Sequence, residues 1–168
     1  MHVKCIICYL NVLNKMKLAE ALSLRKDLET CISKIRKLLE STIRVQEGDT
    51  PAEDPTVLMT ELDNCLEQLE HYIYCINVTN MSIKDDEGKT MTKLLAERDV
   101  LGKRIEVLCN TFNAATGPVN RYTRNEIKYV AVIDIKPIRQ QINKLNQQYR
   151  ELDMKIQAMN FTNDLMEL

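Results

Sequence analysis

Turn-forming and aromatic residues are scarce in this chain of 168 residues, which has four Gly, four Pro and no Trp. Because sandwiches and barrels need many turns, this scarcity argues against an all-β fold. No apolar run approaches the ~18 residues that a membrane-spanning helix needs. Charge of one sign is also lacking, since 23 basic and 24 acidic residues leave a net charge of −1. This balance gives no electrostatic reason to expect nucleic acid as a partner.

Histidine is almost absent, which limits the chemistry available to the chain. Only His2 and His71 occur, whereas a di-metal site in a helical bundle needs two Glu-x-x-His pairs on facing helices. Glu67 and Glu70 lie beside His71 with no second histidine to oppose them. We therefore expect a solvated face there, and no metal, cofactor or catalytic site.

The six cysteines do not form a secretory pattern. Cys31, Cys65 and Cys109 fall on or beside apolar stripes, where a thiol acts as a small apolar filler. The Cys5-x-x-Cys8 pair has neither a second pair nor a strand–helix unit after it, so a metal or redox role is not favoured. Free thiols in a reducing cytoplasm are the expectation.

Four segments of helical periodicity dominate the sequence. Asp54 before Pro55, and Asp134 further on, are predicted helix N-caps. Each segment has one apolar stripe, so all four must pack lengthwise. The predicted fold is all-α, either an antiparallel up-down four-helix bundle or a pair of long helical hairpins. The predicted helices cover about residues 18–42, 55–77, 92–116 and 134–159.

One segment, residues 127–133, has the composition of a strand. An isolated strand leaves its amides unpaired, and residues 42–46 also alternate apolar and polar side chains. If both segments lie at the same end of the helices, they form a two-stranded β cap. Otherwise another subunit would complete the strand.

The first fifteen residues differ from the rest of the chain. Asn11 and Asn14 interrupt their apolar run, and no signal-peptide cleavage site follows. Strong helix formers begin at Met16. We predict that residues 1–15 are an extension before the functional start, and that residues 16–168 form a single helical domain.

The two halves of the chain repeat each other. A Leu-x-x-Arg-x-x-Leu-x-x-x-Ile motif begins at Leu22 and again at Leu95. Asn-x-Thr-Asn endings occur at 77–80 and 160–163, and they are further apart than the two leucine motifs. A heptad requires neither the arginines nor these endings, so we predict an internal duplication.

The repeated arginines, Arg25 and Arg98, lie on apolar stripes. A guanidinium there is costly unless it is paired, and its planar fork suits a carboxylate. We predict that Glu70 and Asp153 hold the two arginines in one of two pairings and fix the register of the helices. The alternative is that both arginine side chains extend to solvent.

Polar side chains are densest at the end where the predicted cap lies. One interpretation is a salt-bridged cap that orders two long loops, and the other is a recognition surface for a protein or a small anion. The residues of this loop-end surface are Arg44, Gln46, Glu47, Asp54, Arg121, Tyr122, Arg124, Glu126 and Lys128.

Several short motifs match a family pattern, and they are Arg44-Val-Gln-Glu-Gly-Asp49 with Glu53-Asp-Pro55, Arg98-Asp-Val-Leu101, Arg121-Tyr-Thr-Arg124-x-Glu-Ile-Lys128, and Leu152-Asp153 with Asn160-Phe-Thr162. In these motifs the chain resembles the bacterial family labelled septicolysin, over about residues 16–165. Phe161 stands where that pattern has Trp. The resemblance implies a small helical bacterial protein of uncharacterised function, and the label implies membrane damage.

The predicted function is that of a non-catalytic structural or protein-interaction module. Tyr72, Phe112 and Tyr149 add more apolar surface than one thin bundle hides, so we expect a homo-oligomer and an unidentified protein partner. A membrane-active cytolysin is one alternative. An unrecognised enzyme or small-anion binder at the loop end is another.

Overall fold

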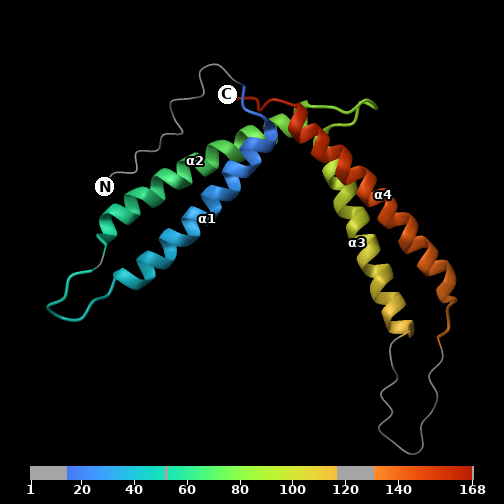
Figure 1. Ribbon diagram of the computed structural model, residues 1–168, viewed down its shortest axis with the longest axis horizontal. Helices are drawn as coiled ribbons and strands as arrows, with labels where there is room; N and C mark the ends of the chain where they lie inside the picture. The colour runs from blue at the N-terminus through green and yellow to red at the C-terminus, as the bar shows by residue number, and fades with distance from the viewer. Residues whose placement is uncertain (1–14, 52, 117–130, 168) are drawn as a thin grey trace, which may run out of the picture.

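A computed structural model describes residues 15–51, 53–116 and 131–167. The described residues form four α-helices (Figure 1), which are α1 (Leu18–Thr42), α2 (Pro55–Ser82), α3 (Met91–Thr116) and α4 (Ile135–Thr162). The all-α prediction is confirmed.

Local side chains determine where the helices begin. The Asp54 carboxylate accepts a hydrogen bond from the Thr56 N–H at 2.8 Å, and Pro55 takes the first helical position. Asp134 accepts in the same way from the Lys136 N–H at 3.0 Å. Each carboxylate satisfies an N–H that has no partner within its own helix. Both predicted N-caps are confirmed.

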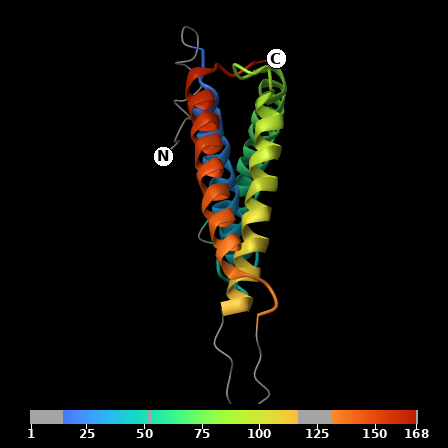
Figure 2. The same ribbon diagram turned by 90° about the vertical axis from the view of Figure 1, so that its right-hand side faces the viewer.

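The helices form two antiparallel hairpins that meet at one end and diverge from there (Figure 1). We call the α1–α2 hairpin arm 1, the α3–α4 hairpin arm 2, and their meeting point the apex. In Figure 2, α1 lies behind α4 and α2 lies behind α3, so the arms are two facing layers. Of the two predicted arrangements, the structure has the pair of long hairpins.

The apex holds the main hydrophobic core, to which every helix contributes. Fully burying a side chain such as Leu18 or Ile156 contributes about 1.5–3 kcal/mol. Met16, the predicted start of the helical domain, is buried in this core, whereas residues 1–14 lie outside the described residues. The core consists of Met16, Leu18, Ala21, Cys75, Ile76, Met91, Leu94, Ile156, Met159 and Leu165.

Two matching backbone hydrogen bonds close the apex. The Leu18 N–H at the start of α1 donates to the carbonyl of Asn163, which follows α4, at 3.0 Å. The Met91 N–H at the start of α3 donates to the carbonyl of Ile83, which follows α2, at 3.1 Å. Leu18 thus corresponds to Met91 with the same offset that relates Leu22 to Leu95 in the sequence repeat.

The ends of α2 and α4 correspond in a different register from the one that the sequence repeat predicts. The two hydrogen bonds match Ile83 with Asn163, whereas aligning the Asn-x-Thr-Asn endings would match Ile83 with Met166. We call the observed correspondence the structural register. It shifts α4 by three positions relative to the alignment of those endings.

Burial in α2 and α4 follows the structural register. Ile76 corresponds to Ile156 and Thr79 to Met159, and all four side chains are buried. The alignment of the endings instead pairs Ile156 with Ile73, which is 41% exposed. The environments of α2 and α4 therefore agree with the structural register.

Burial is sparse in the arms beyond the apex. No residue of α3 from Leu95 to Thr116 is buried, although Leu101, Ile105 and Leu108 lie on its predicted apolar stripe. A closed four-helix bundle would cover such residues from two sides. A single layer of two helices leaves them half-exposed.

The predicted two-stranded β cap is not supported. α1 continues through Thr42, and the described residues of both segments, 43–46 and 131–133, contain no strand. Residues 127–130 lie outside the described part of the chain. The prediction required the two segments to share one end of a closed bundle, but they belong to the tips of arms that diverge (Figure 1).

Candidate functional site

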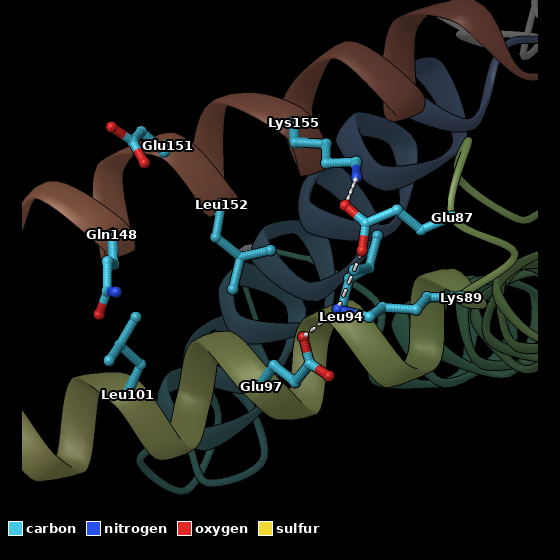
Figure 3. Close-up of a pocket in the computed structure, with 9 residues that line it drawn as sticks. All are labelled: Glu87, Lys89, Leu94, Glu97, Leu101, Gln148, Glu151, Leu152 and Lys155. Carbon is cyan, nitrogen blue, oxygen red and sulfur yellow. Dashed lines mark hydrogen bonds and ion pairs between the residues drawn. The ribbon is translucent and has the colours of Figure 1, made fainter. Parts of the chain in front are cut away.

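A pocket of about 580 Å³ opens between α3 and α4, beside the connection from α2 to α3. Figure 3 shows Lys155 pointing from α4 toward Glu87 of the connection, and Glu97 pointing from α3 toward Lys89. Charged side chains from three segments thus converge here. The pocket is lined by Glu87, Lys89, Leu94, Glu97, Leu101, Gln148, Glu151, Leu152 and Lys155.

The connection is a tight turn built around Asp85. Asp85 Oδ1 accepts hydrogen bonds from the N–H groups of Glu87 at 3.0 Å and Lys89 at 2.8 Å. The Asp85 N–H donates to the Lys89 carbonyl at 2.9 Å. Gly88 has a φ of +80°, a left-handed conformation that favours glycine. This Asx-type turn fixes the positions from which Glu87 and Lys89 reach the pocket.

Lys155 joins α4 to this turn. Its Nζ lies 2.7 Å from Asp85 Oδ2 and 3.6 Å from Glu87 Oε1. The Asp85 side chain is only 1% exposed, so its charge needs a partner inside the protein. Contact with the Lys155 ammonium lowers the pKa of Asp85, and the same contact raises the pKa of Lys155.

Lys89 continues this network of ion pairs from Glu87 to α3. Its Nζ lies 3.4 Å from Glu87 Oε2 and 3.5 Å from Glu97 Oε2. The contact with Glu87, followed by that with Glu97, raises the pKa of Lys89. Each ammonium group lies between two carboxylates, so the network holds the connection against both helices of arm 2.

The lining of this pocket offers structural contacts more than reactive groups. It contains no histidine, cysteine, serine or threonine. Within the ranges that the structure describes, no three His, Cys, Asp or Glu side chains are arranged to hold a metal ion. What the observed geometry can do is order the turn between the arms and fix where α3 begins.

The structure brings together one of the predicted arginine–carboxylate pairs. Arg98 Nη1 lies 3.6 Å from Asp153 Oδ1 on α4, and Arg98 Nη2 lies 3.0 Å from its neighbour Asp99. Arg25 lies instead against Glu29 of its own helix, with Nε and Oε1 3.5 Å apart.

Glu70 is exposed on α2 and makes no ion pair among the described residues. The register of the arms gives the reason. In the structural register, Asp153 corresponds to Ile73 and not to Glu70. Glu70 is therefore about one helical turn away from the place where a carboxylate would match Asp153. Arm 1 has an isoleucine where arm 2 has the partner of its arginine.

The loop-end surface is only partly described. Arg44, Gln46 and Glu47 are exposed at the tip of arm 1, and Asp54 is occupied as the N-cap of α2. The other five predicted members, from Arg121 to Lys128, lie outside the described residues.

Sequence reasoning missed the pairing of Asp85 with Lys155. The local signal was present, because an aspartate placed shortly before a glycine, as Asp85 is before Gly88, is typical of a turn. Nothing in the sequence shows that this turn meets Lys155, which lies in the last helix, since that contact depends on how α4 packs at the apex.

None of the helices described has the length and apolar character to cross a membrane. A family described as being of unknown function (DUF6847) matches residues 25–165, which include most of α1, all of α2, α3 and α4, and the apex connection. The chain belongs to this family. The match replaces the resemblance to septicolysin, which is wrong, and nothing supports the cytolytic activity that the label implied.

A solved structure shares the fold of this DUF6847 chain. The crystal structure of a functionally unknown conserved protein from Corynebacterium diphtheriae is 37% identical and has a TM-score of 0.86. The alignment covers 91% of this chain and all of that one. The aligned part of this chain is large enough to include residues of both arms. No curated protein matches the sequence.

Proposed function

We propose that this DUF6847 protein is a non-catalytic structural or protein-interaction module whose arms are covered by a helical partner. The observation that carries the proposal is the lack of any buried residue in α3 after Leu94. Leu101, Ile105 and Leu108 are covered from one side only, so a further helical layer would remove them from water.

Exposed apolar side chains on the arms support the same function. Val100 and Val107 of α3 are 67% and 63% exposed, and Leu66 of α2 is 45% exposed. Isolated exposed apolar residues are ordinary, but these lie beside half-buried apolar stripes and widen them. A surface of this kind is typical of a helix–helix interface.

We also infer that the two arms arose by internal duplication. Leu18 and Met91 begin equivalent helices with equivalent hydrogen bonds, at the spacing of the repeated sequence motif. The ends of α2 and α4 correspond as well, in the structural register. A duplicated hairpin gives each arm the same kind of packing surface, so one arm is suited to pack against another.

A cytoplasmic location belongs to the same proposal. The sulfurs of Cys31 and Cys65 are 3.8 Å apart, which is a contact between two thiols and not the ~2.05 Å of a disulfide bond. Two thiols that lie this close stay reduced in a reducing compartment.

Substitution of Val100 and Val107 by serine tests the proposed function. We expect the purified wild-type protein to bind a protein partner, either itself or another chain, in a fixed ratio, and the variant to lose that binding while keeping its helical circular dichroism. Lys103→Ala with Glu106→Ala on the same helix is the matched control. Equal binding by both variants contradicts the proposal, as does wild-type protein that binds no protein at all.

A further inference from the structure

A row of exposed apolar side chains runs along α2. Met59, Leu66 and Ile73 are one heptad apart, so they lie on nearly the same side of the helix, and all three are exposed. Tyr74, beside Ile73, is exposed as well. The row therefore lies open to solvent along much of arm 1.

Part of this row is hollowed into a groove of about 450 Å³. In knobs-into-holes packing, residues i, i+3, i+4 and i+7 of one helix form the hole that receives a side chain of a facing helix. The lining contains two such sets in succession, the second beginning four residues after the first. The groove thus has the spacing to receive successive side chains of an α-helix. It is lined by Leu66, Leu69, Glu70, Ile73, Tyr74 and Asn77.

The charge around this groove is negative. α2 carries four acidic residues and no lysine or arginine, and they are Glu61, Asp63, Glu67 and Glu70. None of the four makes an ion pair with another side chain of the described residues. Glu70 lines the groove, and Asp63 lies one heptad before it on the same side of α2. A helix in the groove is favoured if basic residues flank its apolar ones.

α3 offers a useful comparison. A groove of about 310 Å³ beside Val100 has the same spacing of lining residues, namely Lys93, Ala96, Glu97, Val100, Leu101 and Arg104. Its charges are mixed, however, and Glu97 lies 3.9 Å from Lys93 and 3.5 Å from Lys89. The α3 groove therefore fits a helix without selecting the sign of its charge, whereas the α2 groove selects a basic one.

We propose that the α2 groove binds a basic amphipathic helix of a partner protein. This inference deepens the proposed function, since it names the chemistry of the helix that covers arm 1. Apolar side chains of the partner enter the holes beside Leu66 and Ile73, and its lysines or arginines meet Asp63 and Glu70. The stretch from Met59 to Asn77 is ~27 Å long, which matches a helix of about 18 residues.

Three designed peptides of about 18 residues, each with a fluorophore at its N-terminus, test the proposal. The basic peptide has leucines along one face and lysines elsewhere. The acidic peptide has the same leucines with glutamates in place of the lysines. The scrambled peptide has the composition of the basic one, with its leucines spread around the helix. Binding to the full-length protein is measured by fluorescence anisotropy at several salt concentrations.

Two double variants locate the binding surface. Leu66→Ser with Ile73→Ser removes apolar contacts, and Asp63→Asn with Glu70→Gln removes two charges. Circular dichroism and thermal unfolding check that each variant keeps its fold. The matched controls change exposed side chains on other elements, and they are Met154→Ser with Phe161→Ser and Asp86→Asn with Glu106→Gln.

We expect the basic peptide to bind the wild type with a dissociation constant of about 10 μM or lower, and at least tenfold more tightly than either other peptide. The serine variant should weaken this binding about tenfold or more, since two apolar contacts are lost. The Asp63→Asn, Glu70→Gln variant should weaken it about three- to tenfold and make it less sensitive to salt. Both controls should bind like the wild type.

The inference is overturned if the basic peptide binds no more tightly than the acidic or the scrambled one, or if either α2 variant binds it like the wild type. It is also overturned if the wild type binds no peptide but forms an oligomer that the serine variant lacks, because a second copy then occupies the groove. Failure of the peptide alone, with partner binding through Val100 and Val107 intact, leaves the proposed function standing. A wild type that binds neither peptide nor protein refutes both.

Discussion

The hydroxyl of Thr79 in α2 accepts a hydrogen bond from the backbone N–H of Met166 at 2.9 Å, although the two residues are far apart in sequence. The same hydroxyl donates to the carbonyl of Cys75 at 2.7 Å, and the Thr79 side chain is fully buried. The segment after α4 is thereby attached to arm 1 by a side chain of the apex.

Replacement of Thr79 by valine should release this segment. Valine keeps the shape but leaves the Met166 N–H without its acceptor, so we expect a loss of about 1–2 kcal/mol in the free energy of unfolding. Hydrogen exchange at the Met166 amide should accelerate. Thr79→Ser is the control, because it keeps the hydroxyl and should keep that amide protected. Equal exchange in both variants would show that the hydrogen bond does not hold the segment.

Asp85 should make stability depend on acid pH. Its pKa is lowered in the folded protein by Lys155, so its stabilising contribution is complete above the unfolded pKa of about 3.9 and is lost as the pH falls through the folded value. Asp85→Asn keeps the Oδ1 acceptor of the turn but removes the charge. We expect urea unfolding midpoints between pH ~5 and ~2 to fall less steeply in this variant. The same flattening in Asp86→Asn, its exposed neighbour, would contradict this role for Asp85.

We propose that the contact of Arg98 with Asp153 helps to fix the register of arm 2. In a double-mutant cycle, Arg98→Met and Asp153→Leu should show a coupling energy of about 0.3–1 kcal/mol, since both side chains are partly exposed. Arg25→Met and Glu70→Leu form the matched cycle in arm 1 and should add within ~0.3 kcal/mol. Comparable coupling in both cycles would mean that the register argument is wrong.

Mild oxidation should link α1 to α2. The sulfurs of Cys31 and Cys65 are 3.8 Å apart, and a disulfide requires them to approach to ~2.05 Å. Hydrogen peroxide would accept the two electrons and leave as water. We expect peptide mapping to find the Cys31–Cys65 disulfide before any disulfide of Cys75 or Cys109. The free energy of unfolding of the oxidised protein should rise by up to about 3–4 kcal/mol. Cys31→Ser is the control, and earlier linkage of Cys75 or Cys109 would contradict the prediction.

The helices and their caps could be predicted from sequence because the signals are local. Asp54 and Asp134 each satisfy an N–H close by in the chain, so no knowledge of packing is needed. The splay of the arms could not be predicted in this way. Whether two amphipathic layers close along their whole length or only at one end depends on contacts between residues far apart in sequence.

The end of α2 shows why the sequence analysis expected Glu70 to meet an arginine. The sequence predicts that the helix fades near Asn77, but it continues through Ser82. Thr79 and Ser82 bond back to the carbonyls of Cys75 and Val78, so these polar side chains are accommodated within the helix. The structural register that results places Ile73 where Glu70 was expected to meet an arginine.

Because the buried side chains are concentrated at the apex, each arm is held by the core at one end only. Because a helix of 28 residues is ~42 Å long, a rotation of about 10° at the apex would displace the tip of arm 2 by about 7 Å. A small change of side-chain volume at Leu94 or Ile156 would therefore be magnified at Arg44 and the other residues of the far ends.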